Sequence, residues 1–279
     1  MILCRLFPDR KADRPSRLGL AELLIAAFLS YLCLASAPAL LLLIPAPPAL
    51  SSVLSLFGTA AVLLPVLVFL RLDARGARDA LYLSGAHFRA RQLLFLPLSA
   101  LFLFLLMGAL LLVGAYAFAG VNAAPLPYLL LLFLGYLVQG SAEELLCRGL
   151  LMSSLSARYG GRASALISAA FFSLMHIFNP ALSLLGLVNI FLFGLLFAAL
   201  TQQTKSLLPA CLFHAGWNFS LSLVGVEVSG NAPSLSLFVL ESRIPLLTGG
   251  GFGMEASPLL TALLLLSLFL LACGRKAKK

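Results

Sequence analysis

Apolar segments long enough to cross a lipid bilayer follow one another along nearly the whole chain, with short polar loops between them. About 20 apolar residues are needed to cross a hydrocarbon core of roughly 30 Å. Inside that core each segment must pair its own backbone polar groups, so helices are expected. Hydrophobic residues make up 61% of the chain and charged residues only 10%, which excludes an ordinary soluble domain. We therefore predict an all-α fold, a polytopic transmembrane helical bundle of about eight spans. The predicted spans are residues 19–44, 51–70, 93–119, 128–156, 163–179, 182–201, 207–224 and 257–273.

The positions of the basic residues predict how these spans are oriented. Nearly all of the 19 lysines and arginines precede the first span, follow the last, or lie in every second loop. Cytoplasmic loops of membrane proteins are rich in these residues, so both termini are predicted to be cytoplasmic. The net charge of +9 is thus explained by topology and gives no reason to expect a nucleic-acid partner. We expect a multi-pass integral membrane protein, in the plasma (inner) membrane if the chain is bacterial.

The chain is predicted to form a single integral membrane domain, residues 1–279, in three parts. Residues 1–127 are expected to be N-terminal scaffold spans, because the only charge within those spans is Glu22, at a predicted interface. Residues 128–224 form the core that carries the chemistry. Residues 225–279 comprise an outer loop, the last span and a basic tail.

Two loops and the cysteines complete this outline. The outer loop 225–256, with its glycine run 249–251, is expected to be flexible or re-entrant. The loop 71–91 is expected to hold a short interfacial helix. The five cysteines contain no CxxC pair, so neither a disulfide framework nor a zinc ribbon is indicated. The basic N-terminus leads into a segment too long for the apolar region of a cleavable signal peptide.

Two adjacent carboxylates interrupt the fourth span. Glu143 and Glu144 are followed by Arg148, and the i,i+4 spacing favours an ion pair between Glu144 and Arg148. Glu143 is then turned about 100° away on the helix and has no basic partner. A carboxylate in a low-dielectric cavity suits general acid/base chemistry. The alternative is a purely structural buried network, but two acids with one base leave a charge uncompensated.

Two of the three histidines also lie in apolar segments. Phe172 and His176 are spaced i,i+4 in the fifth span, as are His214 and Asn218 in the seventh, so each pair shares a helix face. A single intramembrane histidine is more often a helix–helix hydrogen bond than a catalyst. His214 and Asn218 together could donate to one oxygen, as an oxyanion hole requires.

The expected depths of these side chains permit them to meet. A rise of 1.5 Å per residue from the cytoplasmic helix ends places Glu143 and His176 about 20 Å deep and Asn218 about 17 Å deep. The same rise places His214 about 11 Å deep. A site at this depth would be reached through a water-filled cavity.

The three motifs, taken in order, resemble a known family. Glu-Glu-x-x-x-Arg, Phe-x-x-x-His and His-x-x-x-Asn on successive predicted helices are similar to those of the CPBP family, the CAAX-processing and bacteriocin-immunity (Abi) intramembrane proteases. The resemblance covers roughly residues 128–224. It implies that Glu143 is the general base that activates water, that Glu144 supports it and that Arg148 holds the acid pair. It also implies that His176 orients the water.

The same resemblance implies that His214 and Asn218 stabilise the tetrahedral oxyanion. Members of the family have been described both as metalloproteases and as glutamic-type proteases. In a metal-dependent enzyme, Glu143, His176 and His214 would be the ligands of zinc or another divalent ion, although they do not form HExxH. We favour a glutamate-activated water without a cofactor; the sequence is compatible with either.

Two neighbouring residues carry weaker alternatives. Cys147 lies i,i+4 from Glu143 and so shares its face, which raises the question of a cysteine nucleophile. A buried thiol without an adjacent base is normally inert, so packing is the expected role. Trp217 precedes Asn218 and is also expected to pack.

The leading hypothesis is an intramembrane endopeptidase, a hydrolase acting on a membrane-anchored protein or peptide. The substrate would be a CAAX-type C-terminus, a bacteriocin-like peptide or a C-terminal sorting signal. One alternative is a non-enzymatic immunity or assembly factor on the same scaffold, which would not need all six polar residues. Another is a proton-coupled transporter, since acid and histidine relays mark those too; no second Glu-Glu segment suggests the inverted repeats of such proteins. The sequence indicates no oligomeric state.

Overall fold

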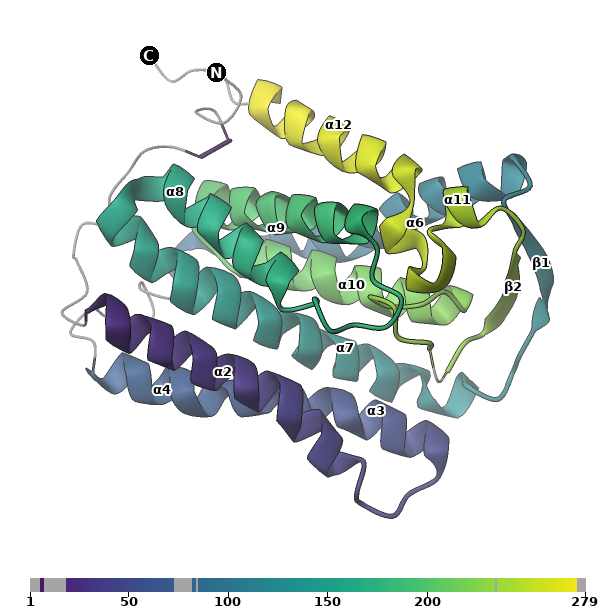
Figure 1. Cartoon of the computed structure of the whole chain (residues 1–279), viewed down its shortest axis with the longest axis horizontal. Helices are drawn as coiled ribbons and strands as arrows, with labels where there is room; N and C mark the ends of the chain where they lie inside the picture. Colours follow the sequence, from purple (N-terminus) through teal and green to yellow (C-terminus); the bar gives the residue numbers. More distant parts are fainter. Residues whose placement is uncertain (1–5, 8–18, 73–81, 84, 234, 275–279) are drawn as a thin grey trace.

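The computed structural model describes residues 6–7, 19–72, 82–83, 85–233 and 235–274, most of them in helices (Figure 1). The α-helices are α2 (Leu20–Leu41), α3 (Pro48–Gly58), α4 (Leu63–Leu72), α6 (Phe95–Leu112), α7 (Leu129–Glu144), α8 (Ser153–Leu174), α9 (Leu184–Thr204), α10 (Leu208–Val224), α11 (Pro245–Thr248) and α12 (Pro258–Gly274). A 3₁₀ turn, Thr59–Val62, joins α3 to α4, and a π-helix, Leu145–Met152, joins α7 to α8.

The long helices lie side by side along one axis, with α7 to α10 at the centre (Figure 1). There α8 packs on α9, and α10 packs on α7 and α6. Helix α3 packs on α7, α2 packs on α3 and on the π-helix that continues α7, and α12 packs on α9. This order surrounds the polar motifs of α7, α8 and α10 with protein on all sides.

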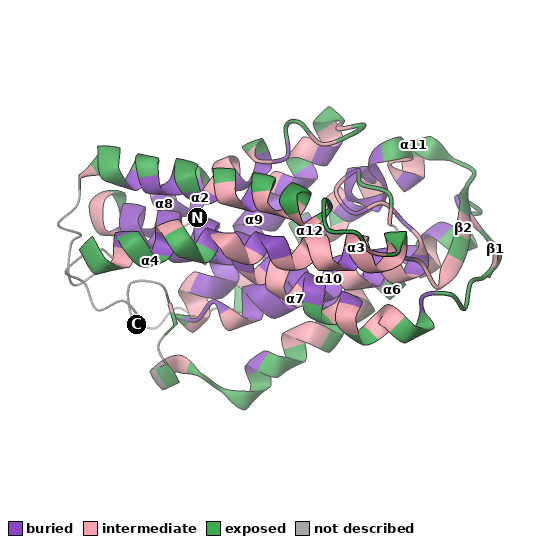
Figure 2. Cartoon of the chain, turned by 90° about the horizontal axis from the view of Figure 1, so that it is seen from below, coloured by how far each residue is buried: buried purple, intermediate pink, exposed green. Residues whose placement is uncertain are grey.

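The outer faces of the bundle are strongly apolar. Leucine, isoleucine, valine and phenylalanine side chains are exposed along α2, α4, α6 and α12, and Figure 2 shows exposed residues on the outside of the bundle and buried residues within it. Such continuous apolar surface is unfavourable in water and suits contact with lipid chains. By length and composition, five helices in the described part of the chain can cross a membrane.

Every predicted span contains helix, but the lengths differ from those expected. One of the five long helices, Leu126–Leu174, combines the fourth and fifth predicted spans. The chain reverses within it at Gly160, whose φ of 81° and ψ of 171° are not helical. Helix α12, with 17 residues, falls below the length expected of a full span. The number of spans therefore remains a prediction.

The helix ends agree with the expected alternation of loops. Three helix ends, those at the beginning of α2 and at the ends of α4 and α9, lie together with the turn within α8 at one end of the bundle, at the left of Figure 1. The predicted basic loops adjoin these points. That this end faces the cytoplasm is still a prediction from charge.

The prediction of the third span, 93–119, was wrong at its C-terminal end. Helix α6 stops at Leu112, and Tyr116–Val121 form a strand, β1, that pairs antiparallel with β2, Phe238–Ser242. Strand residues in contact with lipid would leave backbone groups unpaired, so pairing with β2 replaces the helix as the source of hydrogen bonds. The fold is mostly helical rather than all-α.

The outer loop 225–256 is more ordered than predicted. It contains β2 and α11, and its residues Phe252, Met254 and Glu255 are buried. In the loop 71–91, the predicted interfacial helix falls partly on residues 73–81 and 84, outside the described residues. The described part holds two 3₁₀ helices, Gly85–His87 and Ala90–Leu94.

Candidate functional site

The acid pair lies where α7 passes into the π-helix. Glu143 and Glu144 are the last residues of α7, and Arg148 lies in the π-helix that follows. The predicted ion pair is present: Arg148 Nη1 lies 2.9 Å from Glu144 Oε1, and both side chains are fully buried. Single π turns inside α-helices are often found at functional sites, because the wider turn redirects side chains.

The surroundings of Arg148 hold its guanidinium in place. Its Nη2 donates a hydrogen bond of 3.0 Å to the carbonyl of Gly194 on α9. Its Cζ lies 4.5 Å from the ring centroid of Phe172 and 5.4 Å from that of Phe197. Aromatic faces attract a cation, and more strongly where water is excluded. Arg148 thus links α7, α8 and α9 around Glu144.

His214 of α10 lies between the two carboxylates. Its Nδ1 is 3.1 Å from Glu144 Oε1, and its Nε2 is 3.9 Å from Glu143 Oε2. Because Glu144 is an ionised acceptor paired with Arg148, Nδ1 carries the hydrogen that is donated to it. The ring stacks on Phe197 at a centroid distance of 5.2 Å. His214 is therefore oriented by Glu144 and directed at Glu143.

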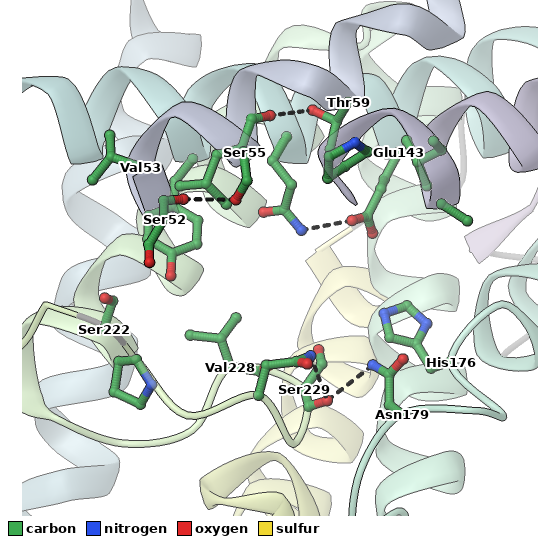
Figure 3. A pocket seen from close by; sticks show the side chains of 18 of the residues that line it. Ser52, Val53, Ser55, Thr59, Glu143, His176, Asn179, Ser222, Val228 and Ser229 are labelled. Atoms are coloured by element: carbon green, nitrogen blue, oxygen red, sulfur yellow. Dashed lines mark hydrogen bonds between the residues drawn. The ribbon is translucent and has the colours of Figure 1, made fainter. Parts of the chain in front are cut away.

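Glu143 faces a cavity of about 590 Å³ (Figure 3). Its Oε1 accepts a hydrogen bond of 2.7 Å from Gln139 Nε2, and its Oε2 is buried without a hydrogen-bond partner. An unpaired buried oxygen is costly unless a water or substrate group completes its bonding. Because Glu143 lines the cavity and its Oε2 has no partner in the protein, this carboxylate can accept a proton.

His176 lines the same cavity from the turn that follows α8, and Figure 3 shows it with Glu143 among the residues around the cavity. Its Nδ1 lies 2.8 Å from the carbonyl oxygen of Phe172. A carbonyl only accepts, so Nδ1 carries hydrogen and, in the neutral ring, Nε2 is a free acceptor. The i,i+4 spacing of Phe172 and His176 thus selects the tautomer of the histidine.

Asn218 reaches the acid pair through a residue that the sequence analysis missed. Asn218 Nδ2 donates a hydrogen bond of 3.0 Å to Gln139 Oε1, and Gln139 Nε2 in turn donates to Glu143. Gln139 lies i,i−4 from Glu143 on α7, so its position on the same helix face was the signal that could have revealed it. All six predicted site residues are buried, with Gln139 as the connection to Asn218.

Replacing Gln139 with leucine should lower activity without unfolding the protein. The change keeps the volume but removes the hydrogen bonds that orient Glu143 and Asn218, each worth about 1 kcal/mol. We expect a loss of roughly 10-fold in kcat, measured on the purified chain. An unchanged kcat would show that neither side chain needs Gln139.

The N-terminal helices contribute to the cavity as well as supporting the core. Tyr31 and Leu34 of α2 and Ser52 and Ser55 of α3 line it. Residues 1–127, predicted as scaffold, thus supply the wall that faces α7.

Cys147 and Trp217, the two weaker candidates, are both packed against other side chains. Cys147 is fully buried, its Sγ lies 3.6 Å from Met175 Sδ, and it is not among the residues that line the cavity. Trp217 donates from Nε1 to Glu255 Oε1 at 3.1 Å and packs edge-on against Phe102.

The acid and histidine side chains do not form a metal-binding cluster as they are placed. Among the described residues, no group of three histidine, cysteine, aspartate or glutamate side chains is arranged to hold one metal ion. The alternative ligand set Glu143, His176 and His214 is therefore not assembled in this geometry.

Comparison with known families identifies the central part of the chain. Residues 125–220 match the family model described as Type II CAAX prenyl endopeptidase Rce1-like. No curated protein matches the chain. The matched range contains the acid pair, Arg148, both histidines and Asn218, and it ends before the outer segment 225–256.

Proposed function

Since residues 125–220 match the family model described as Type II CAAX prenyl endopeptidase Rce1-like, we propose that this chain hydrolyses a peptide bond of a membrane-anchored substrate by means of water activated by Glu143. The family is one of proteases, and the chain is a multi-pass membrane protein of CAAX-protease type. The membership inferred from the three motifs is confirmed. The observation that carries the proposed mechanism is that Glu143 lines the same cavity as His176 and that one of its carboxylate oxygens, Oε2, has no hydrogen-bond partner in the protein.

The reaction begins with a water molecule between Glu143 and His176. The water donates one hydrogen to the Glu143 carboxylate and the other to Nε2 of His176, and its oxygen attacks the carbonyl carbon of the substrate. Glu143 takes the proton as the carbon–oxygen bond forms. It then returns the proton to the amide nitrogen as the carbon–nitrogen bond breaks, which releases a carboxyl product and an amine product.

The negative charge on the tetrahedral intermediate requires hydrogen-bond donors. Asn218 has two N–H groups on its amide and uses one for Gln139, so the other is available to the oxyanion; Asn218 and His214 lie behind the residues that line the cavity. His214 supplies a second donor through Nε2 when that nitrogen is protonated, with Glu144 and Arg148 fixing its ring. Donors placed before the reaction begins are worth about 10²–10³ in kcat each.

The walls of the cavity favour an extended polypeptide segment. The lining combines apolar side chains, among them Leu34, Leu56 and Leu132, with hydroxyls such as those of Ser52 and Ser55. Such a mixture accommodates both the side chains and the backbone polar groups of a peptide. We propose as substrates CAAX-type C-termini, bacteriocin-like peptides or C-terminal sorting signals.

The test is a comparison of membrane-protein termini in cells that express the wild-type chain or Glu143→Gln at matched levels. New C-termini that appear with the wild type alone support the proposal. A phenotype shared by the two proteins and absent from cells lacking both, with no difference in termini, would replace it with a non-enzymatic binding role.

Metal dependence is checked on the purified chain. Because Glu143 and His176 can hold the water through hydrogen bonds alone, cleavage should be unchanged after treatment with a strong chelator and dialysis. Loss of cleavage with recovery on adding Zn²⁺ would contradict a metal-free mechanism and would require Glu143, His176 and His214 to rearrange into a metal site.

A further inference from the structure

A buried carboxylate outside the matched domain contacts the helix that carries the second histidine. Glu255 lies in the 3₁₀ turn Met254–Ala256 and is only 4% exposed. Its Oε1 accepts from Trp217 Nε1 at 3.1 Å, and its Oε2 accepts from the backbone N–H of Ser229. One side chain therefore joins α10, next to Asn218, to the outer loop.

The backbone around Glu255 is held from a third direction. Asn189 of α9 donates through Nδ2 to the carbonyl of Glu255 at 2.9 Å and to that of Ser257 at 3.0 Å. Thr261 of α12 donates to Asn189 Oδ1 at 2.7 Å. Because Asn189 holds the carbonyls of Glu255 and Ser257, the carboxylate of Glu255 has a defined position from which to hold the loop.

The loop that Glu255 holds is a wall of the catalytic cavity. Val228, Ser229 and Asn231 line the cavity together with Glu143 and His176, and Figure 3 shows Ser229 joined to Asn179. That bond, from Asn179 Nδ2 to the Ser229 carbonyl, measures 2.9 Å. The loop is thus connected on one side to the turn that carries His176 and on the other to Glu255.

The backbone conformation of this loop is tightly constrained at Gly230. Gly230 has a φ of +79°, and a Cβ there would lie 2.1 Å from the carbonyl oxygen of Pro180. Its N–H donates to the carbonyl of Phe252, in the segment that leads to Glu255. The close approach of this loop to its neighbours requires glycine.

Burying a carboxylate is costly. Burial raises the pKa of Glu255, and the hydrogen bonds from Ser229 and Trp217 offset only part of that effect. An apolar residue in its place would avoid the cost but would leave the N–H of Ser229 and of Trp217 without partners. This argues that the residue is kept for the geometry that it imposes.

We propose that Glu255 is a positioning residue that holds the loop Val228–Asn231 against the cavity, and that this loop selects which peptide segments reach Glu143. The role of the loop in selectivity rests on the proposed function. The attachment of the loop to Glu255, called the clamp below, does not. Val228 presents an apolar side chain to the cavity and so limits the space beside the loop. The loop therefore favours substrates whose side chain next to Val228 fits into that space.

The clamp is tested by amide hydrogen exchange on the full chain in lipid nanodiscs. Glu255→Gln keeps the size of the side chain but turns an amide N–H₂ toward Trp217 or Ser229. Trp217→Phe keeps an aromatic ring and removes only the indole donor. Both should speed exchange in peptides covering residues 226–233 by about 10-fold or more, the effect of losing a hydrogen bond to a charged group. The control is Glu241→Gln, whose carboxylate on β2 is 64% exposed.

Selectivity is tested with internally quenched peptides in which one residue beside the scissile bond varies from glycine to tryptophan. Glu255→Gln should change the ratio of kcat/KM between small and large residues by about 10-fold. Val228→Phe, which leaves the clamp intact, should disfavour the large residues. Unchanged hydrogen exchange in both Glu255→Gln and Trp217→Phe would overturn the clamp. A lowered Tm of Glu255→Gln with unchanged kcat/KM ratios would reduce Glu255 to a structural role. If the wild type cleaves no peptide and alters no membrane-protein terminus, the proposed function fails while exchange still decides the clamp.

Discussion

Replacing Glu143 with glutamine should lower peptide-bond hydrolysis by about 10²–10⁴-fold, the usual contribution of a general base. The amide has the shape of the carboxylate and can keep its hydrogen bond with Gln139, whose Nε2 lies 2.7 Å from Glu143 Oε1. It cannot take a proton from water, however. Folding and substrate binding should therefore remain near wild type, so the effect should appear in kcat and not in KM.

The measurement is steady-state cleavage of a peptide or a membrane-anchored protein by the purified chain, with Tm measured on the same samples. His87→Ala is the matched control, because His87 lies in the 3₁₀ helix Gly85–His87 and does not line the catalytic cavity. That variant should keep full activity. Turnover preserved in Glu143→Gln would remove Glu143 from its role, and a strong loss in His87→Ala would mean that the wrong histidines have been assigned.

Replacing Arg148 with methionine should destabilise the protein by about 3–5 kcal/mol, the usual effect of removing one partner of a buried ion pair. Glu144 would keep the hydrogen bond to His214 but lose its cation, and the carbonyl of Gly194 would lose its donor. We expect low yield of folded protein and a lower Tm in detergent, with activity lost at the same time.

A double variant separates the ion pair from simple packing. Glu144→Leu combined with Arg148→Met removes both charges and should recover much of the lost stability, although not activity, because His214 would no longer be oriented. Arg243→Met is the control, since that side chain is 63% exposed, and exposed ion pairs contribute little. A stable and active Arg148→Met protein would refute the structural role of the pair.

The combination of these variants distinguishes catalysis from binding. A binding factor would tolerate Glu143→Gln and fail only when Arg148 is changed, because the first variant keeps the shape of the site and the second disrupts it. A protease fails in both, for different reasons: one loses its base, and the other loses the structure around it.

Local spacing was enough to predict the parts of the site that lie within one helix. The Glu144–Arg148 pair and the Phe172–His176 pair are each spaced i,i+4, and both meet in the structure. The apolar segments and the basic loops likewise predicted where helices would form, because length and hydrophobicity are properties of the chain itself. The exception is the end of the third span, where pairing with a strand more than 100 residues away replaces the helix.

Contacts between distant elements could be known only from the tertiary structure. Spacing on one helix could not show that His214 lies between the two carboxylates, or that Asn218 reaches Glu143 through Gln139. Nor could it show that α2, α3 and the loop around Ser229 complete the cavity. These contacts depend on how the helices pack against one another, which a single periodicity does not encode. The sequence by itself determined which polar residues interrupt the apolar helices and on which helices they lie, because spacing and hydrophobicity belong to the chain; the packing of those helices decided which atoms face one another.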